Sequence, residues 1–415
     1  MSHYKPYPAY RDSGVEWIGQ VPEHWKKMPF KRVASICNGH DYKEVENADG
    51  AYPVIGSGGE FARASDFMFD GESVLLGRKG TIDKPLYING PFWAVDTMFY
   101  TKIADNAFPK FVYYNALTIP FGLYSTNTAL PSMAGEDLSS HVIAAPDFEE
   151  QKAIATGVDR ETTRIDALIA KKTRFIELLK EKRQALITHA VTKGLDTNVP
   201  MRDSKSEWIG EVPEHWRVCS LGYLSRISTG GTPDRKNDSY WNGEIPWVKT
   251  GEINYKIISD TEERITDAGL SNSATFIAEP GTILMAMYGM GVTRGRVAVL
   301  GIPASFNQAC AAISCSSGVH NWYVFYCLCA AYRFIRDLGN EASQVNLNLE
   351  IVSKIKVPVP PLLEQEEIEK HLVAQLQKLD AIEQRVSNSI SLIKERRSAF
   401  ITAAVTGQID LRESA

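Results

Sequence analysis

Apolar residues recur with a heptad spacing in two long segments of the chain. Seven of eleven heptad positions are apolar over residues 154–189, and eight of eleven are apolar over residues 368–403. This period, sustained over about five heptads, predicts two long helices that pack on each other as an antiparallel coiled coil. The predicted core positions are Ile154, Val158, Ile165, Leu168, Phe175, Leu179, Leu186, Ile368, Leu372, Leu379, Ile382, Val386, Ile393 and Phe400.

The segments that precede these helices carry a different pattern. Residues 26–146 and 217–360 are rich in short β-type runs broken by Gly and Pro, such as Ser73–Leu76 and Arg296–Leu300. Such runs predict mixed α/β globular domains with a few short helices. The fold class is therefore α+β, with two globular domains at 1–146 and 197–360 and two helical segments at 147–196 and 361–415 that separate and join them.

An internal repeat relates the two halves of the chain, and it is the most informative feature of the sequence. Residues 12–25 and 203–216, here called the repeated motif, are identical at eleven of fourteen positions. Further matches are faint but ordered: 52–55 faces 245–248 at an offset of 193, and 74–76 faces 283–285 at 209. Glu150-Gln151 then matches Glu364-Gln365 at 214. Each half therefore has constant ends and a diverged middle, and a pseudo-twofold relation is expected.

Composition and charge exclude several classes of protein. With 415 residues and a 44% hydrophobic fraction, the chain can bury more than one core. It has no apolar run of about 18 residues and no signal pattern, so we expect a cytoplasmic protein that does not span a membrane. The six cysteines form no C-x-x-C pair and are expected to be reduced and mostly buried. A net charge of −5 gives no electrostatic footprint of nucleic-acid binding.

Catalytic, cofactor and metal motifs are not found. Gly77–Thr81 lacks the spacing of a phosphate loop, and Gly56–Gly59 reads as a flexible turn. Asp147 and Glu150 match the residue types of a metal-nuclease motif, but their spacing better fits the cap of a helix. His24 and His215 lie in the repeated motif and are interpreted as architectural. The sequence predicts no catalytic residue, no metal site and no cofactor bound by this chain.

Polar residues in the diverged middles are candidates for recognition, because arginine and amide side chains on loops of a rigid body suit base or phosphate contact. For the amides, satisfaction of buried backbone groups is an equal alternative. The candidates for DNA contact are Arg78, Lys79, Thr81, Lys249, Tyr288, Thr293, Arg294, Arg296, Asn307, Gln344 and Asn346. Gln308 and Asn348 are further amides of the same kind.

Taken together, these motifs resemble one family, the specificity (HsdS) subunits of type I restriction-modification systems. The resemblance rests on the repeated motif, the Pro-x-x-x-Glu-Gln start of each long helix, and the segments Gly281–Gly289 and Phe306–Cys310. It implies that 1–146 and 197–360 are target recognition domains, each reading one half of a bipartite, gapped and asymmetric DNA sequence. The helices then act as conserved spacers.

The resemblance also implies a non-catalytic subunit within a larger enzyme. Two modification (methyltransferase) subunits would carry S-adenosylmethionine, restriction (translocase and nuclease) subunits would use ATP and Mg, and this chain would bind double-stranded DNA and dock both. Two alternatives remain open. A coiled-coil scaffold predicts no DNA binding, and a self-sufficient nuclease or methyltransferase predicts activity from the isolated chain.

Overall fold

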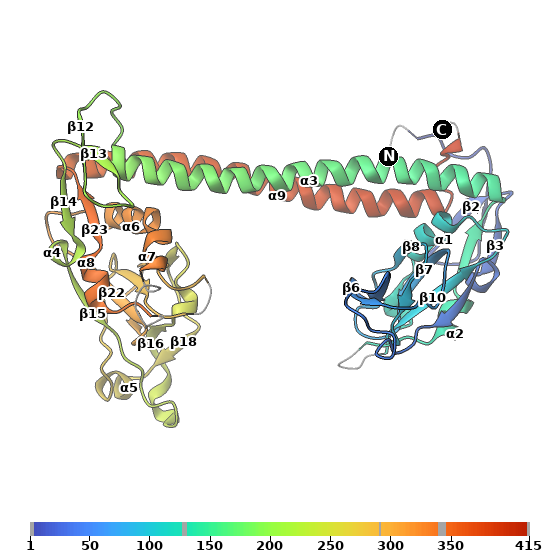
Figure 1. The fold of residues 1–415 in the computed structure, drawn as a ribbon, viewed down its shortest axis with the longest axis horizontal. Coiled ribbons are helices and arrows are strands. Elements are labelled where there is room, and N and C mark those ends of the chain that lie inside the picture. The colour runs from blue at the N-terminus through green and yellow to red at the C-terminus, as the bar shows by residue number, and fades with distance from the viewer. Residues whose placement is uncertain (1–3, 127–130, 290–291, 339–345, 413–415) are drawn as a thin grey trace. The chain divides into compact units, whose positions relative to one another are not determined.

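The computed structural model describes residues 4–126, 131–289, 292–338 and 346–412. The chain forms two compact units (Figure 1). The first unit contains residues 1–173 and 387–415, and the second contains residues 174–386. The two long helices are divided between these units rather than forming a body of their own. Among the described residues, none of the helices has both the length and the apolar content needed to cross a membrane.

The first unit is a mixed α/β body that contains the start of one long helix and the end of the other. Its strands are β1 (Tyr10–Asp12), β2 (Gln20–Pro22), β3 (Lys26–Pro29), β4 (Ala34–Asn38), β5 (Tyr52–Gly56), β6 (Gly59–Ala64), β7 (Glu72–Gly77), β8 (Leu86–Asn89), β9 (Trp93–Ala94), β10 (Met98–Ile103) and β11 (Val142–Ala145). Its helices are α1 (Pro109–Ala116), α2 (Gly135–Ser140), and parts of α3 (Phe148–Lys193) and α9 (Leu362–Val405).

The second unit is built in the same way. Its strands are β12 (Met201–Asp203), β13 (Glu211–Pro213), β14 (Arg217–Ser220), β15 (Ser225–Thr229), β16 (Trp241–Val248), β17 (Ile257–Ile258), β18 (Glu263–Ile265), β19 (Ile283–Ala286), β20 (Val297–Leu300), β21 (Ser305–Phe306), β22 (Cys310–Cys315) and β23 (Lys356–Val359). Its short helices are α4 (Leu221–Leu224), α5 (Asp267–Ser271), α6 (Asn321–Ala330), α7 (Tyr332–Asp337) and α8 (Leu349–Lys354).

Strand order shows that the two units share one topology. The sheets β4-β10-β7-β8 and β6-β5-β9 of the first unit correspond to β15-β22-β19-β20 and β18-β16-β21 of the second, where β17 adds a fifth strand. In each three-stranded sheet the central strand has one antiparallel neighbour and one parallel neighbour. The predicted fold class, two mixed domains related by an internal repeat, is confirmed.

The ladder registers confirm the faint sequence correspondences. Val54 pairs with Trp93 as Trp247 pairs with Ser305, which places Val54 and Trp247 at the predicted offset of 193. Gly77 pairs with Met98 as Ala286 pairs with Cys310, which gives the predicted offset of 209. The offset rises between these points because the segments containing β17 and α5 are extra in the second unit.

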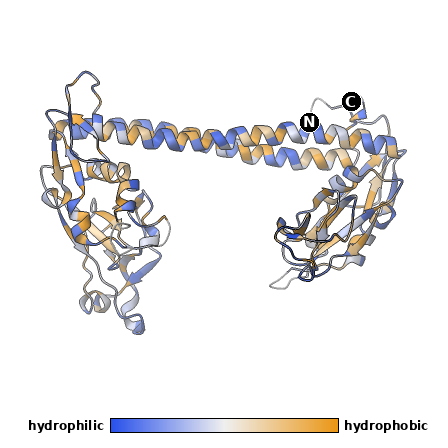
Figure 2. Cartoon of the chain, in the orientation of Figure 1, coloured by the Kyte–Doolittle hydropathy of each residue, from blue (hydrophilic) through white to orange (hydrophobic). Residues whose placement is uncertain are grey.

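The long helices pack against each other within each unit. In the first unit the start of α3 shares a core with the end of α9, and Asp166 Oδ1 lies 2.9 Å from Arg397 Nε. In the second unit the end of α3 shares a core with the start of α9, and Arg183 pairs with Asp380. Both pairs are therefore antiparallel, as predicted. Hydrophilic and hydrophobic residues alternate along both helices (Figure 2).

Three predicted core positions of these helices are instead exposed. Leu168 and Phe175 keep 44% of their surface, and Ile382 keeps 39%. Leu186, Val386 and Ile393 are half-buried, and the remaining predicted positions are buried. In a pair of helices, each residue at the helix–helix contact is covered from one side only. Polar residues such as Glu161 and Lys172 also interrupt the row of apolar heptad positions. These three side chains therefore stay exposed within their own units.

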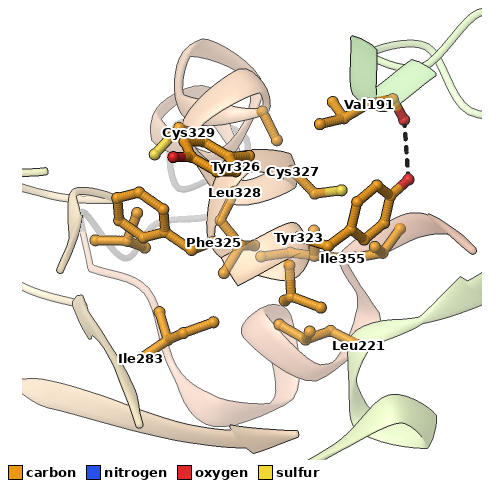
Figure 3. Packing of buried hydrophobic residues seen from close by; sticks show 14 of the residues in the cluster. Val191, Leu221, Ile283, Tyr323, Phe325, Tyr326, Cys327, Leu328, Cys329 and Ile355 are labelled. Carbon is orange, nitrogen blue, oxygen red and sulfur yellow. Dashed lines mark hydrogen bonds between the residues drawn. The ribbon is translucent and has the colours of Figure 1, made fainter. Parts of the chain in front are cut away.

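The core of the second unit contains the thiols that the sequence predicts to be buried. Cys327 and Cys329 lie on α6 among Tyr323, Phe325 and Leu328 (Figure 3). The Tyr323 hydroxyl donates a hydrogen bond to the Val191 carbonyl at 3.2 Å and so ties α6 to the end of α3. All six cysteines are free thiols, although Cys37, Cys219 and Cys315 are only half-buried. Burial raises the pKa of Cys315 to about 12 and so keeps this thiol protonated.

A carboxylate joins the repeated motif to the start of each long helix. In the first unit Glu150 accepts hydrogen bonds from Trp25 Nε1 at 3.0 Å and from His24 Nε2 at 2.9 Å. Glu150 is 8% exposed, and its backbone N–H donates to the Asp147 side chain, which confirms the predicted helix cap. The architectural interpretation of His24 is also confirmed.

The second unit repeats these two hydrogen bonds around a half-buried carboxylate. Glu364 accepts hydrogen bonds from Trp216 Nε1 at 3.0 Å and from His215 Nε2 at 2.9 Å. The next residue acts alike in both units, because the Gln151 and Gln365 side chains each accept from the backbone N–H before a short helix, at 2.9 Å. The constant ends of the sequence are thus one structural device used twice, which we call the carboxylate junction: Trp25, His24 and Glu150, or Trp216, His215 and Glu364.

We predict that Glu150→Ala destabilises the first unit by about 2–3 kcal/mol, because the variant leaves the buried Trp25 indole N–H without an acceptor. Hydrogen exchange measured by mass spectrometry on the whole chain will show faster exchange in residues 10–30 and 148–160. The neighbouring exposed residue provides the control, Glu149→Ala. Equal protection in both variants would show that the junction contributes nothing to stability.

We also predict a pH dependence that arises from His141. Burial lowers the pKa of this imidazole to about 4, whereas the unfolded chain has a value of about 6.5. The unfolded state alone therefore binds a proton between these values, so the free energy of unfolding falls as the pH falls through this window. Phe30 N donates to His141 O as Leu221 N donates to Ile355 O, so Ile355 occupies the position of the second unit that matches His141. In His141→Ile, urea midpoints at about pH 7 and about pH 5 will differ less than in the unsubstituted chain, and an unchanged difference would contradict this assignment.

Candidate functional site

The diverged loops of each unit meet at one edge of its sheets. In the first unit this edge consists of residues 39–41, 56–59, 78–81 and 95–97, and in the second of residues 230–232, 249–251, 287–289 and 307–309. We call it the loop edge. Backbone hydrogen bonds hold the segments together: His40 N donates to Ala94 O at 3.0 Å, and Arg78 N to Thr97 O at 2.8 Å.

The second unit reproduces these backbone bonds with different side chains. Gly231 N donates to Phe306 O at 3.0 Å, and Met287 N donates to Ala309 O at 2.8 Å. Both units have a glycine where the loop after the first sheet strand passes close to a facing backbone segment. A Cβ at Gly39 or Gly230 would lie 2.0 Å from a backbone carbonyl oxygen of that segment. One backbone frame therefore presents two unrelated sets of side chains.

The predicted recognition residues of the first unit lie on the loop edge. Arg78, Lys79 and Thr81 follow β7, and Lys79 and Thr81 are exposed. The Arg78 guanidinium donates to the Asp96 backbone carbonyl at 3.3 Å and lies over the Phe99 ring at 5.8 Å. A half-exposed guanidinium held in this way keeps donors available for a ligand in front of the edge.

In the second unit the structure brings together Lys249, Tyr288 and Asn307, which follow β16, β19 and β21. Tyr288 is 42% exposed. Lys249 Nζ lies 2.9 Å from Glu262 Oε2 and 3.0 Å from Glu263 Oε1, and these bonds raise the pKa of the lysine. The Asn307 side-chain oxygen accepts a hydrogen bond from Ala309 N at 3.1 Å, so this oxygen stabilises the turn at 307–309.

The other candidates of the second unit have different surroundings. Arg294 is 7% exposed and donates to the Arg336 carbonyl at 2.5 Å, so this buried guanidinium fastens α7 to the loop that precedes β20. Arg296 donates to Asn254 Oδ1 at 3.1 Å and lies over Tyr255. Thr293 is half-buried beside them, Asn346 is exposed, and Gln344 lies outside the described residues.

A hollow of about 550 Å³ opens at the loop edge of the second unit. Thr232, Trp247, Lys249 and Asn307 line it. Arg235 stands at its side, with its guanidinium 3.8 Å from the Trp241 ring centre and 2.6 Å from a Glu263 oxygen. The described residues contain no cluster of three His, Cys, Asp or Glu side chains suited to a metal ion.

Sequence reasoning missed three residues of the loop edge. Thr232 donates its hydroxyl hydrogen to the Gln308 side-chain oxygen in the second unit. At the matching positions of the first unit stand Asp41 and Asp96, both exposed. Extending the offset of 191 past the repeated motif aligns Gly39 with Gly230, and this signal was available in the sequence.

Comparisons with known proteins agree with this architecture. The curated relatives include the MjaIX specificity subunit of Methanocaldococcus jannaschii, which is 27% identical over 39% of this chain and 38% of its own length. The EcoBI specificity subunit of Escherichia coli is 20% identical over 96% of this chain and 89% of its own. A solved chain from a study of complex assembly in a type I R-M system shares the fold, with a TM-score of 0.72 at 14% identity over 94% of this chain and 99% of that one.

The family model described as type I restriction modification DNA specificity domain matches residues 22–178 and again residues 213–392. The two matches cover most of the chain and correspond to its two repeats. The chain therefore belongs to the family of type I restriction-modification DNA specificity subunits.

Proposed function

We propose that each diverged domain reads one half of a bipartite, gapped and asymmetric sequence in double-stranded DNA. The observation that carries this proposal is the loop edge, where one backbone frame presents different side chains in the two units. Identical frames dock to DNA in the same manner, whereas different side chains select different bases. The constant helices, of 46 and 44 residues, set the spacing between the half-sites.

Catalysis belongs to partner subunits in this proposal. Two modification subunits hold S-adenosylmethionine and methylate adenine, and restriction subunits use ATP and Mg to translocate and cleave. The partners also supply much of the phosphate neutralisation, because this chain carries a net charge of −5 and Lys249 is already paired with carboxylates.

The row of exposed apolar positions on the long helices is the proposed docking surface for a modification subunit. In the first unit, a groove of about 400 Å³ lies between α3 and α9 and includes Ile165, Leu168 and Ile393. Leu168 is 44% exposed, and Leu392 of the facing helix is 64% exposed. Arg164 and Arg396 border the apolar floor with charge, as in the polar rim of a protein interface.

We predict that Leu168→Glu weakens co-purification of the modification subunit at least tenfold, because the carboxylate would be desolvated in the groove. The measurement is a pull-down of the co-expressed complex, with circular dichroism of the chain as a check on folding. Thr163→Glu adds the same charge at an exposed position of the same helix and serves as the control. Retention of the partner by both variants would place the docking surface elsewhere.

We predict that exchanging residues 217–360 for the corresponding segment of the EcoBI relative changes only one half of the methylated sequence. The measurement is genome-wide sequencing of methylated adenine in a host that expresses the chain with its modification subunit. A gapped motif with one altered half is the expected result. An unaltered motif would refute the recognition function, and absence of any motif with an active partner would favour a scaffold.

A further inference from the structure

On the loop edge of each unit, two polar residues occupy matching backbone positions but differ in their side-chain chemistry. In the second unit Thr232 lies two residues after Gly230, and Gln308 follows β21. Their side chains are hydrogen-bonded to each other. In the first unit the same two positions carry Asp41 and Asp96. We call these the edge pairs.

Backbone bonds establish the match for both members. His40 N donates to Ala94 O as Gly231 N donates to Phe306 O, so Asp41 and Thr232 each come one residue later. Val95 N donates to Ile55 O at 3.2 Å as Asn307 N donates to Val248 O at 3.0 Å, so Asp96 and Gln308 each come one residue later. The turn then closes in the same way, because Met98 N donates to Val95 O and Cys310 N donates to Asn307 O. The two side chains therefore leave the same point of the same frame.

The side chains around the edge pairs differ just as sharply. In the first unit the Arg78 guanidinium donates to the Asp96 backbone carbonyl, so it lies next to the residue that carries the exposed carboxylate. Met287 takes the position of Arg78 in the second unit and is 2% exposed, so this position carries a buried apolar side chain instead of a cation. The first unit offers guanidinium donors and carboxylate acceptors, and the second offers an amide and a hydroxyl.

We propose that the edge pairs, together with Arg78, are specificity-determining residues of the two domains. Arg78 and Asp96 contact a G·C pair in the half-site of the first unit, and Gln308, oriented by Thr232, contacts an A·T pair in the half-site of the second. This inference rests on the proposed DNA-recognition function and names the groups that carry it out.

The chemistry of the base edges supports this assignment. Arginine bonds to guanine O6 and N7, and a carboxylate accepts from the cytosine amino group. A carboxylate repels phosphate, so the exposed Asp96 at a DNA surface is suited to a base edge and not to the backbone. Glutamine pairs with adenine N6 and N7, and its oxygen retains a second lone pair after accepting from Thr232.

The test is methylated-adenine sequencing with the complete chain and its modification subunit. Gln308→Ala is expected to reduce the base preference about tenfold or more at one position, in the same half that responds to exchange of residues 217–360. Asp96→Ala is expected to relax one position of the other half. Lys354→Ala, an exposed change on α8 away from the loop edge, is expected to leave both halves unchanged.

Conservative variants distinguish reading from folding. Gln308→Glu keeps an acceptor for Thr232 and is expected to shift the preferred base from adenine towards cytosine, while Asp96→Asn relaxes its own position. The proposal is overturned if these variants keep full preference in both halves, or if they lower methylation at all sites without relaxing any base. Those outcomes leave the recognition function intact, because that function fails only if exchange of residues 217–360 leaves the motif unaltered.

Discussion

The carboxylate junction determines how the rest of this protein is organised. Glu150 and Glu364 each accept a tryptophan N–H and a histidine N–H, with almost the same distances in the two units. Each carboxylate lies in the first turn of a long helix, and each tryptophan lies at the end of a repeated motif. A hydrogen bond to an ionised acceptor is strong and directional, so the junction fixes the start of each helix against its own domain. Because the same residues are needed twice, the ends of the two halves resemble each other.

The loop edge carries the opposite kind of constraint. Its backbone must keep glycine at positions 39 and 230, where a Cβ would meet a carbonyl oxygen, but its side chains are free to differ. The extra segments of the second unit, which contain β17 and α5, are inserted between shared strands, and Trp247 still pairs with Ser305 as Val54 pairs with Trp93. Loops tolerate such insertions at low cost. A junction that is the same in both halves and an edge that differs between them therefore coexist in each domain.

Much of the architecture could be predicted from the sequence, because it repeats. The repeat revealed two related halves, and the motif histidines were interpreted as architectural, in agreement with their bonds to Glu150 and Glu364. The heptad pattern predicted helix pairs but not the exposure of Leu168, since periodicity identifies a face and not what covers it. The burial of Arg294 could not be predicted because it depends on a contact with Arg336, 42 residues later. Thr232 and Asp96 were missed because their positions on the loop edge depend on backbone bonds between segments far apart in the chain.

The central claim is that two interchangeable frames read two sequences through their own side chains. The most direct measurement is the methylated motif produced by a chain in which residues 217–360 also replace residues 26–146. The account predicts a motif that contains the second half-site twice and lacks the first. Retention of the original asymmetric motif would contradict it, because specificity would then reside outside the diverged domains.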